Sequence, residues 1–292
     1  MREEPTRSLT AAHPPVRARL TVVRVAGYAA LVATSVLMAA PLLWMLSTAL
    51  KPESQIFRYP IEWIPQTPTL SNFARVLSDY PIARWFFNSM AVALLTTAVG
   101  VPLYALAAYP LARLNFPGKR VVFLIILATM LMPVEATMVP LFLGLSRMRL
   151  SDSYMSLVMP VVANAFGLYL LTQFFQTIPT ELRDAAVIDG AGHLTILSRI
   201  ILPLSKPALT TVSIFTFMAS WNNFVWPFIV TNTDSTRTLP AGLAALIGGV
   251  DVGTRFGISM ASALIATLPP VVIFIALQRY FAQGISLTGT KG

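Results

Sequence analysis

The chain has 292 residues, of which 55% are hydrophobic and only 11% are charged, and its mean hydropathy is +0.69. Because an average soluble domain carries about 25% charged residues, this composition argues against a water-soluble globular protein. There is no cysteine, and the two histidines, His13 and His193, are isolated. The sequence therefore offers no disulfide, no thiolate site and no histidine cluster for a metal, and no bound cofactor is expected.

Six apolar segments predict six transmembrane helices and therefore an all-α membrane protein. Five of them are uncharged runs of 23 to 28 residues, and the sixth contains a single acid, Glu135. Each exceeds the ~20 residues that cross a ~30 Å hydrocarbon core, where backbone polar groups must be paired within a helix. The predicted transmembrane domain is 25–278, with spans at about 25–48, 88–112, 121–145, 154–174, 207–230 and 257–278, between tails 1–24 and 279–292.

The distribution of basic residues predicts that both termini lie on the inner side of the cell membrane. With that orientation, 13 of the 21 Lys and Arg residues lie in inner segments and 8 in outer segments. The first apolar run is longer than the ~7 to 15 residues of a signal peptide, so we expect a retained span. The expected environment of the spans is membrane lipid. No inner segment combines a basic patch with interleaved aromatics, so no nucleic-acid partner is expected.

The inner segment 175–206 is long enough to hold a folded element that faces a soluble partner. Thr180 is expected to be the N-cap of a helix of about two turns, with Glu181 in its first turn. Gly190 and Gly192 are expected to end that helix. A helix that merely connects two spans is the alternative interpretation.

The spacing of residues in this segment resembles a known signature. Asp184-Ala185-Ala186, three residues, Gly190, nine residues, Ile200, one residue and Leu202-Pro203 follow the pattern E-A-A-x3-G-x9-I-x-L-P of ABC importer permeases, with Asp in place of Glu. The resemblance implies that this helix is the coupling helix, which sits in a cleft on an ATPase subunit. The implied coupling residues are Glu181, Asp184, Ala185, Ala186, Asp189, Gly190, Ile200, Leu202 and Pro203.

Further motifs resemble the smaller permease subunit of maltose-type carbohydrate ABC importers. They lie at 68–73, 108–113, 221–224 and 284–292, and 132–135 followed by 152–154 is similar to the glycerol-3-phosphate branch. The family implies a type I importer permease fold, a second related permease, two ATP-binding-cassette ATPase subunits and an extracytoplasmic solute-binding protein. It also implies that the C-terminal residues Lys291 and Gly292 contact the ATPase and that the glycine-rich outer segment 231–257 reaches the docked binding protein. A passive flexible connection is the alternative interpretation of segment 231–257.

The source of energy can be argued without the resemblance. The chain contains no G-x-x-x-x-G-K-[ST] phosphate-binding loop, so ATP would be hydrolysed in another chain and this one is expected to be non-catalytic. An ion-coupled secondary transporter is the main rival, but such proteins typically carry several intramembrane carboxylates and paired repeats. Here Glu135 is the only acid inside a span, and no internal repeat is evident.

Two polar features within spans are candidates for lining a solute pathway. On a continuous third span, Glu135 would lie about 21 Å along the helix from Val121, either in a cavity or near a kinked helix end where freed amides bind it. Trp221, Asn222 and Asn223 interrupt the fifth span. The amides either form interhelical hydrogen bonds or bind the hydroxyl groups of a sugar-like solute.

Overall fold

The computed structural model describes residues 16–248 and 255–289, and every regular element in these ranges is helical. In chain order, the first eight helices are α1 (Val16–Ala49), α2 (Glu53–Ile56), α3 (Ser71–Asp79), α4 (Ile82–Arg113), α5 (Lys119–Met130), α6 (Val134–Arg147), α7 (Tyr154–Val162) and α8 (Ala165–Thr177). The rest comprises α9 (Thr180–Ile188), α10 (His193–Ile196), η1 (Leu197–Ile201), α11 (Leu202–Leu204), α12 (Lys206–Trp221), α13 (Val225–Val230), α14 (Leu239–Gly248) and α15 (Phe256–Gly289).

Three helices are long and apolar enough to cross a membrane without a break: α1, α4 and α15. In three further places, two successive helices together are long and apolar enough to cross a membrane, but the chain bends between them. The bend is 96° between α5 and α6, 42° between α7 and α8, and 83° between the 193–204 helices and α12. The described chain therefore has up to six spans if each bent pair is counted as one.

The bend between α5 and α6 differs from the continuous helix expected over 121–145. Helix α5 ends at Met130, and α6 begins after Pro133, whose backbone is extended (φ −63°, ψ 128°). A proline removes one backbone donor and disfavours helical backbone at the preceding residue, so the chain breaks there. Likewise, the expected fifth span over 207–230 is divided, because α12 ends at Trp221 and α13 begins at Val225.

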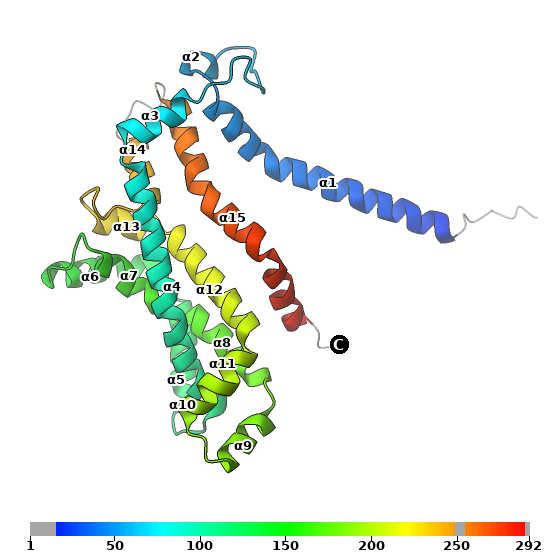
Figure 1. Cartoon of the computed structure of the whole chain (residues 1–292), viewed down its shortest axis with the longest axis vertical. Coiled ribbons are helices and arrows are strands. Elements are labelled where there is room, and N and C mark those ends of the chain that lie inside the picture. Colours follow the sequence, from blue (N-terminus) through cyan, green and yellow to red (C-terminus); the bar gives the residue numbers. More distant parts are fainter. Residues whose placement is uncertain (1–15, 249–254, 290–292) are drawn as a thin grey trace, which may run out of the picture.

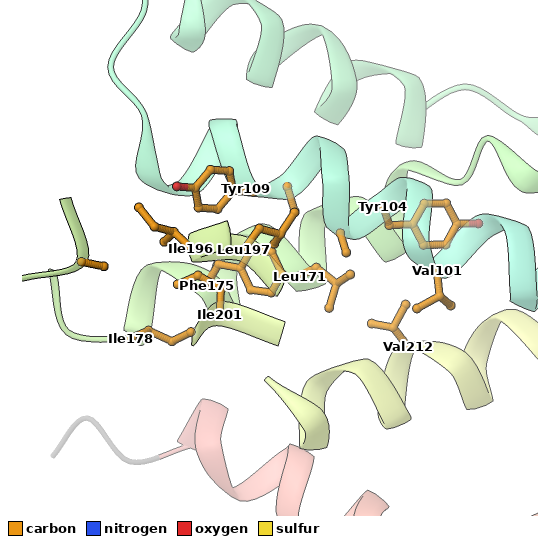
Figure 2. Close-up of a cluster of buried hydrophobic side chains, with 13 residues drawn as sticks. Val101, Tyr104, Tyr109, Leu171, Phe175, Ile178, Ile196, Leu197, Ile201 and Val212 are labelled. Atoms are coloured by element: carbon orange, nitrogen blue, oxygen red, sulfur yellow. The ribbon is translucent and has the colours of Figure 1, made fainter. Parts of the chain in front are cut away.

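Helix α4 is the central element of the bundle and packs against α8 and α12 along its length (Figure 1). Its ring of Tyr104 lies over Gly167 of α8, where a Cβ atom would be 2.7 Å from Tyr104 Cδ2. Tyr104 belongs to the largest buried apolar cluster, which continues towards α9 (Figure 2). One core therefore joins the middle of the bundle to the segment that carries the coupling motif.

Helix α1 projects away from the bundle and approaches it only near α15 and the outer elements (Figure 1). The described apolar side chains along its first part are largely exposed, Tyr28 by 69% and Leu37 by 68%. Near its C-terminal end, Trp44 contacts Trp63, with ring centroids 5.1 Å apart. Most of the apolar surface of α1 is thus available to lipid or to another subunit.

Candidate functional site

The segment with the coupling motif forms α9 at one extreme end of the bundle (Figure 1). Gly190 adopts a left-handed backbone (φ +79°), its N–H donates to Val187 O at 3.0 Å, and Ala191 N–H donates to Ala186 O at 2.9 Å. This pair of bonds is a Schellman motif, which satisfies the last carbonyl groups of a helix and favours glycine at that position. Gly190 therefore ends α9, as expected.

The start of α9 and the role of Gly192 differ from the expectation. Pro179 occupies the N-cap position with extended ψ (136°) and no side-chain cap, and Thr180 is already the first helical residue. Because only the residue before the first turn can cap it through its side chain, Thr180 cannot do so. Gly192 is extended and directly precedes α10, so it does not take part in the cap.

Helix α9 has an exposed face and a buried face. Exposed on it or at its end are Glu181, Leu182, Asp184, Ala185, Val187, Ile188, Asp189 and Gly190, with Ile188 exposed by 86%. Ala186 is only 9% exposed and belongs to the buried cluster of this chain. Ala186, one of the implied coupling residues, therefore packs against its own chain, and Ala185 is the small residue of the outer face.

The surface that holds α9 is apolar and contributed by several elements. Figure 2 shows Tyr109 of α4, Phe175 of α8, Ile178, and Ile196 with Leu197 gathered in one cluster. Phe175 and Ile196 are completely buried. Close packing of such side chains gives α9 a fixed position relative to α4 and α8.

Polar contacts add to this packing. Arg113, the last residue of α4, is buried and donates a hydrogen bond to the carbonyl oxygen of Ile178, two residues before α9. The hydroxyl of Tyr109 lies 3.3 Å from Nδ1 of His193, at the start of α10. The segments on both sides of α9 are therefore tied to the end of α4.

The second half of the motif forms an irregular helical turn. Residues 197–201 make a π-helical turn in which Leu202 N–H donates to Leu197 O. Ile200 and Leu202 pack against the buried cluster, whereas Pro203 is exposed. Pro203 has no N–H to continue the regular hydrogen-bond pattern, and π-turns often accompany functional bends. Pro203 was the signal in the sequence for this irregularity, which was not among the expected features.

The pathway candidates in the fifth span lie in two different environments. Trp221 is 2% exposed, stacks on Phe217 at 6.1 Å between centroids, and donates from Nε1 to Ala266 O at 3.2 Å. It is a packing residue between α12 and α15 and does not line an open surface, contrary to the expectation. Asn222 is exposed and Asn223 is half-buried, and within the described residues neither side-chain amide has a hydrogen-bond partner. The interhelical hydrogen bonds considered above are therefore not made to the described part of this chain.

Glu135 does not lie along a continuous third span. It is exposed in the first turn of α6, directly after the 96° bend, and within the described residues its carboxylate makes no hydrogen bond or ion pair. The estimate of about 21 Å from Val121 along one helix axis is thus wrong, because the axis changes direction at Pro133. An acid in the first turn is favoured by the helix dipole.

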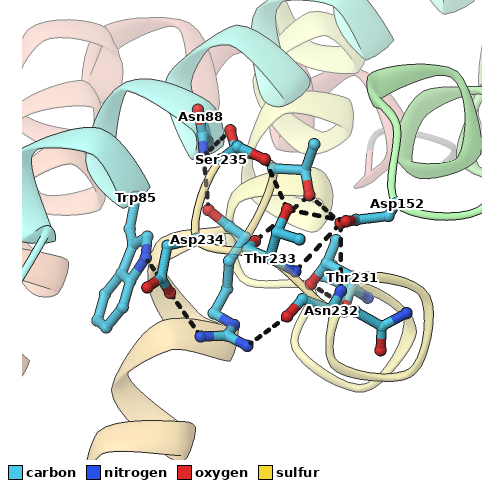
Figure 3. A network of polar contacts seen from close by, with 11 residues as sticks. Trp85, Asn88, Asp152, Thr231, Asn232, Thr233, Asp234 and Ser235 are labelled. Carbon is cyan, nitrogen blue, oxygen red and sulfur yellow. Dashed lines mark hydrogen bonds and ion pairs between the residues drawn. The ribbon is translucent and has the colours of Figure 1, made fainter.

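A polar network at the outer side of α7 was not expected from the sequence (Figure 3). Asp152, with a left-handed backbone (φ 56°), accepts from Thr233 Oγ1 at 2.8 Å, from Asn232 N at 3.1 Å and from the hydroxyl of Thr236. Burial opposes ionisation of Asp152, but these hydrogen bonds outweigh it and hold its pKa below the ordinary value of 3.8. Asp152 thus fixes the loop between α13 and α14.

The same loop is held from α4. Asn88 donates to Ser235 O at 3.1 Å and to Arg237 O at 2.8 Å, while Tyr154 OH donates to Asn88 Oδ1 at 2.6 Å. Trp85 donates from Nε1 to Asp234 at 3.2 Å (Figure 3). Of the other expected contacts, Lys291, Gly292 and residues 249–254 of the outer loop lie outside the described residues.

Comparison with known proteins shows which family the chain is similar to. Residues 100–287 match the family described as binding-protein-dependent transport system inner membrane component. The arabinooligosaccharides transport system permease protein of Halalkalibacterium halodurans is 32% identical over 255 residues, 86% of this chain and 91% of that protein. The sn-glycerol-3-phosphate transport system permease protein of Yersinia enterocolitica is 31% identical over 239 residues, 80% of this chain and 85% of that protein.

A solved structure shares the fold. A chain from the crystal structure of a bacterial ABC transporter involved in the import of the acidic polysaccharide alginate matches with a TM-score of 0.81 and 22% identity, over 93% of this chain and 100% of that one. The family match covers more than half of this chain, and the permease relatives align over most of their length. This multi-pass membrane protein therefore belongs to the family of binding-protein-dependent transport system inner membrane components.

Proposed function

We propose that this chain forms half of the translocation pathway of an ATP-binding-cassette importer for a sugar or sugar-like polar solute. Its partners in this proposal are a second related permease, two ATPase subunits and an extracytoplasmic binding protein. The family description supports the binding protein, and the exposed apolar surface of α1 would be covered by the second permease. The chain itself is non-catalytic, because ATP is hydrolysed in the ATPase subunits.

The observation that carries the proposal is the construction of α9. It is a short helix with an exposed outer face, it ends in a defined cap, and its inner face is packed on α4 and α8. A helix fixed in this way moves together with the core it is packed on, because packed interiors transmit displacement. In our proposal, closure of the ATPase pair displaces α9, and the spans change from inward-facing to outward-facing.

The amides of Asn222 and Asn223 are the proposed contacts of the solute within this chain. Both residues lie in the break between α12 and α13, and their side-chain amide groups make no hydrogen bond to the described residues. Amide groups both donate and accept, which suits sugar hydroxyls. Both groups are neutral, which favours a neutral polar solute over a phosphorylated one, although relatives with the two kinds of name are about equally similar to this chain.

The test is transport by the complete assembly reconstituted in lipid vesicles with its binding protein. We expect uptake of a neutral oligosaccharide that requires ATP on the side where α9 is exposed. An ion gradient without ATP is expected to drive no uptake; uptake under that condition would show a secondary transporter instead. Competition by sn-glycerol-3-phosphate, but not by neutral sugars, would support the glycerol-3-phosphate alternative.

A further inference from the structure

The loop between α4 and α5 forms one wall of an open cleft that the coupling segment does not occupy. The cleft has a volume of about 520 Å³. Its apolar walls are formed by Leu111, Phe116, Val121 and Phe123, and two cations, Lys119 and Arg120, also line it. It lies at the same end of the bundle as α9, because Arg113, two residues after Leu111, is bonded to Ile178.

The two cations in this cleft are not neutralised by the described part of the chain. Lys119 donates from Nζ to the backbone carbonyl of Leu114 at 2.9 Å, which leaves two of its three donors free. Arg120 is exposed, and the ion pairs found in the described residues are Arg183–Asp184 and Arg237–Asp234. Both cations also lie in the first turn of α5, which contains no acid and where the helix dipole makes a positive charge unfavourable.

The apolar side chains that follow place the cleft at the membrane boundary. Directly after Arg120, the outward side chains of α5 are apolar and exposed, Val121 by 60% and Ile125 by 59%. The stacked rings of Phe123 and Tyr169, 6.3 Å apart, fix α5 against α8. A ligand of the cleft thus meets two cations at one end and an apolar wall that continues into the hydrocarbon region at the other.

We infer that this cleft binds an anionic phospholipid of the inner leaflet, with its phosphate at Lys119 and Arg120 and an acyl chain along the apolar wall. The charge of the ligand follows from the two uncompensated cations, and its apolar part follows from the walls. Basic pockets at the cytoplasmic side of membrane helices bind such headgroups. This inference concerns lipid and does not depend on which solute is transported.

The first test measures lipid retention by the transporter isolated from its membrane with this chain tagged. The assembly is placed in an equimolar mixture of phosphatidylglycerol and phosphatidylcholine, extracted again, and the retained lipid is measured by mass spectrometry. We expect the wild type to retain phosphatidylglycerol preferentially. K119Q/R120Q should lower this retention about tenfold or more, because each basic residue near a membrane surface contributes roughly fivefold.

The matched control is R199Q/K206Q, which removes the same charge from exposed residues of the coupling segment and the start of α12. It should retain phosphatidylglycerol like the wild type. Equal loss in the two double variants would show general attraction of anionic lipid to basic residues, and no loss in K119Q/R120Q would show that the cleft holds no anion; either result overturns the inference. Displacement of the lipid by inorganic phosphate at an equal concentration would also overturn it, because the acyl chain would then contribute nothing to binding.

A second measurement leaves both cations in place and asks what covers the cleft. Because the sequence contains no cysteine, F116C introduces a single site for a fluorescent label. We expect brominated phosphatidylglycerol to quench this label more strongly than brominated phosphatidylcholine does. Equal quenching by both lipids would overturn the inference, and so would no quenching by either, because another subunit would then cover the cleft.

Discussion

Arg113 and Ile178 connect the end of α4 to the segment that carries α9 and the coupling motif. The guanidinium of Arg113, at the last residue of α4, donates to the carbonyl oxygen of Ile178, which immediately precedes Pro179 and α9. Arg113 is 7% exposed and Ile178 is also 7% exposed, so this bond is shielded from water. Hydrogen bonds from charged donors contribute about 1.5–3 kcal/mol, more than neutral ones.

Arg113→Met should therefore loosen α9 without preventing insertion of the spans. Methionine keeps an extended apolar side chain but leaves the Ile178 carbonyl without its donor. In the reconstituted transporter we expect normal membrane levels but weaker stimulation of ATP hydrolysis by binding protein and solute. Arg113→Lys keeps one charged donor and should recover part of the stimulation. Equal stimulation in the wild type and in Arg113→Met would show that this bond does not hold the coupling segment.

Neighbouring alanines of α9 should respond differently to enlargement, because they face opposite ways. Ala186→Leu adds volume to a packed cluster, which typically costs about 1–3 kcal/mol, so the thermal stability of the chain should fall. Ala185→Leu adds volume on the exposed side, so the stability should hardly change, whereas binding of the ATPase should weaken. Thermal unfolding and a pull-down with the ATPase separate the two effects.

Each alanine variant is the control for the other. They lie next to each other, carry the same added side chain and have the same helix propensity change. If Ala186→Leu left the stability unchanged while abolishing ATPase binding, the orientation of α9 described above would be wrong. If Ala185→Leu bound the ATPase normally, the outer face of α9 would not be the coupling surface.

The end of α9 at Gly190 could be predicted from the sequence, but its first residue and its orientation could not. Gly190 ends the helix because a left-handed residue is needed there, and this is a property of neighbouring residues. Which of Ala185 and Ala186 faces inward depends on how α9 packs on Phe175 and Ile196, and short helices with alanines in sequence carry no periodic signal for it.

The bend between α5 and α6 and the hydrogen bonds of Asp152 were likewise not predicted from the sequence. Hydropathy finds the apolar segments, but it measures composition, so it predicted one helix across Pro133 where the chain turns by 96°. Asp152 is an unremarkable acid in a short connection. Its role arises because Thr233 and Thr236, more than 80 residues further on, are brought to it by the packing of α7 and α13.

The Asp152 network should make stability depend on external pH. Because the native pKa of Asp152 lies below its ordinary value of 3.8, its stabilising effect is fully present above about pH 4 and is lost as the pH falls through the lower native value. Asparagine at position 152 tolerates the left-handed backbone, but Asp152→Asn removes the negative charge of the group that accepts these hydrogen bonds. We expect the variant to unfold at lower temperature than the wild type at neutral pH, with the difference shrinking at acidic pH.

Asp79→Asn is the control for this experiment. Asp79 is an exposed acid at the end of α3, and its carboxylate accepts a hydrogen bond at 2.7 Å from the hydroxyl of Ser78 on the same helix. Its replacement changes the net charge equally but removes no bond between elements, so unfolding should match the wild type at every pH. A constant difference between the wild type and Asp152→Asn from neutral to acidic pH would contradict the assigned role of the Asp152 carboxylate.

Replacement of Gly242 tests how closely α14 approaches α4. A Cβ atom on Gly242 would lie 2.2 Å from Cε3 of the buried Trp85, so Gly242→Ala must push the two helices apart or displace the indole. The overpacking should cost about 1–3 kcal/mol, more than the ~1 kcal/mol that alanine gains in helix propensity. Gly144→Ala in α6 is the control, because its Cβ meets nothing within 4 Å and only the propensity gain remains.

In thermal unfolding of the purified transporter we expect the Gly242 variant to be less stable than the wild type and the Gly144 variant to be equal or more stable. Trp85→Phe combined with Gly242→Ala should recover part of the loss, because the smaller ring leaves room for the methyl group; equal stabilisation by both glycine replacements would show that α14 does not pack this closely on Trp85.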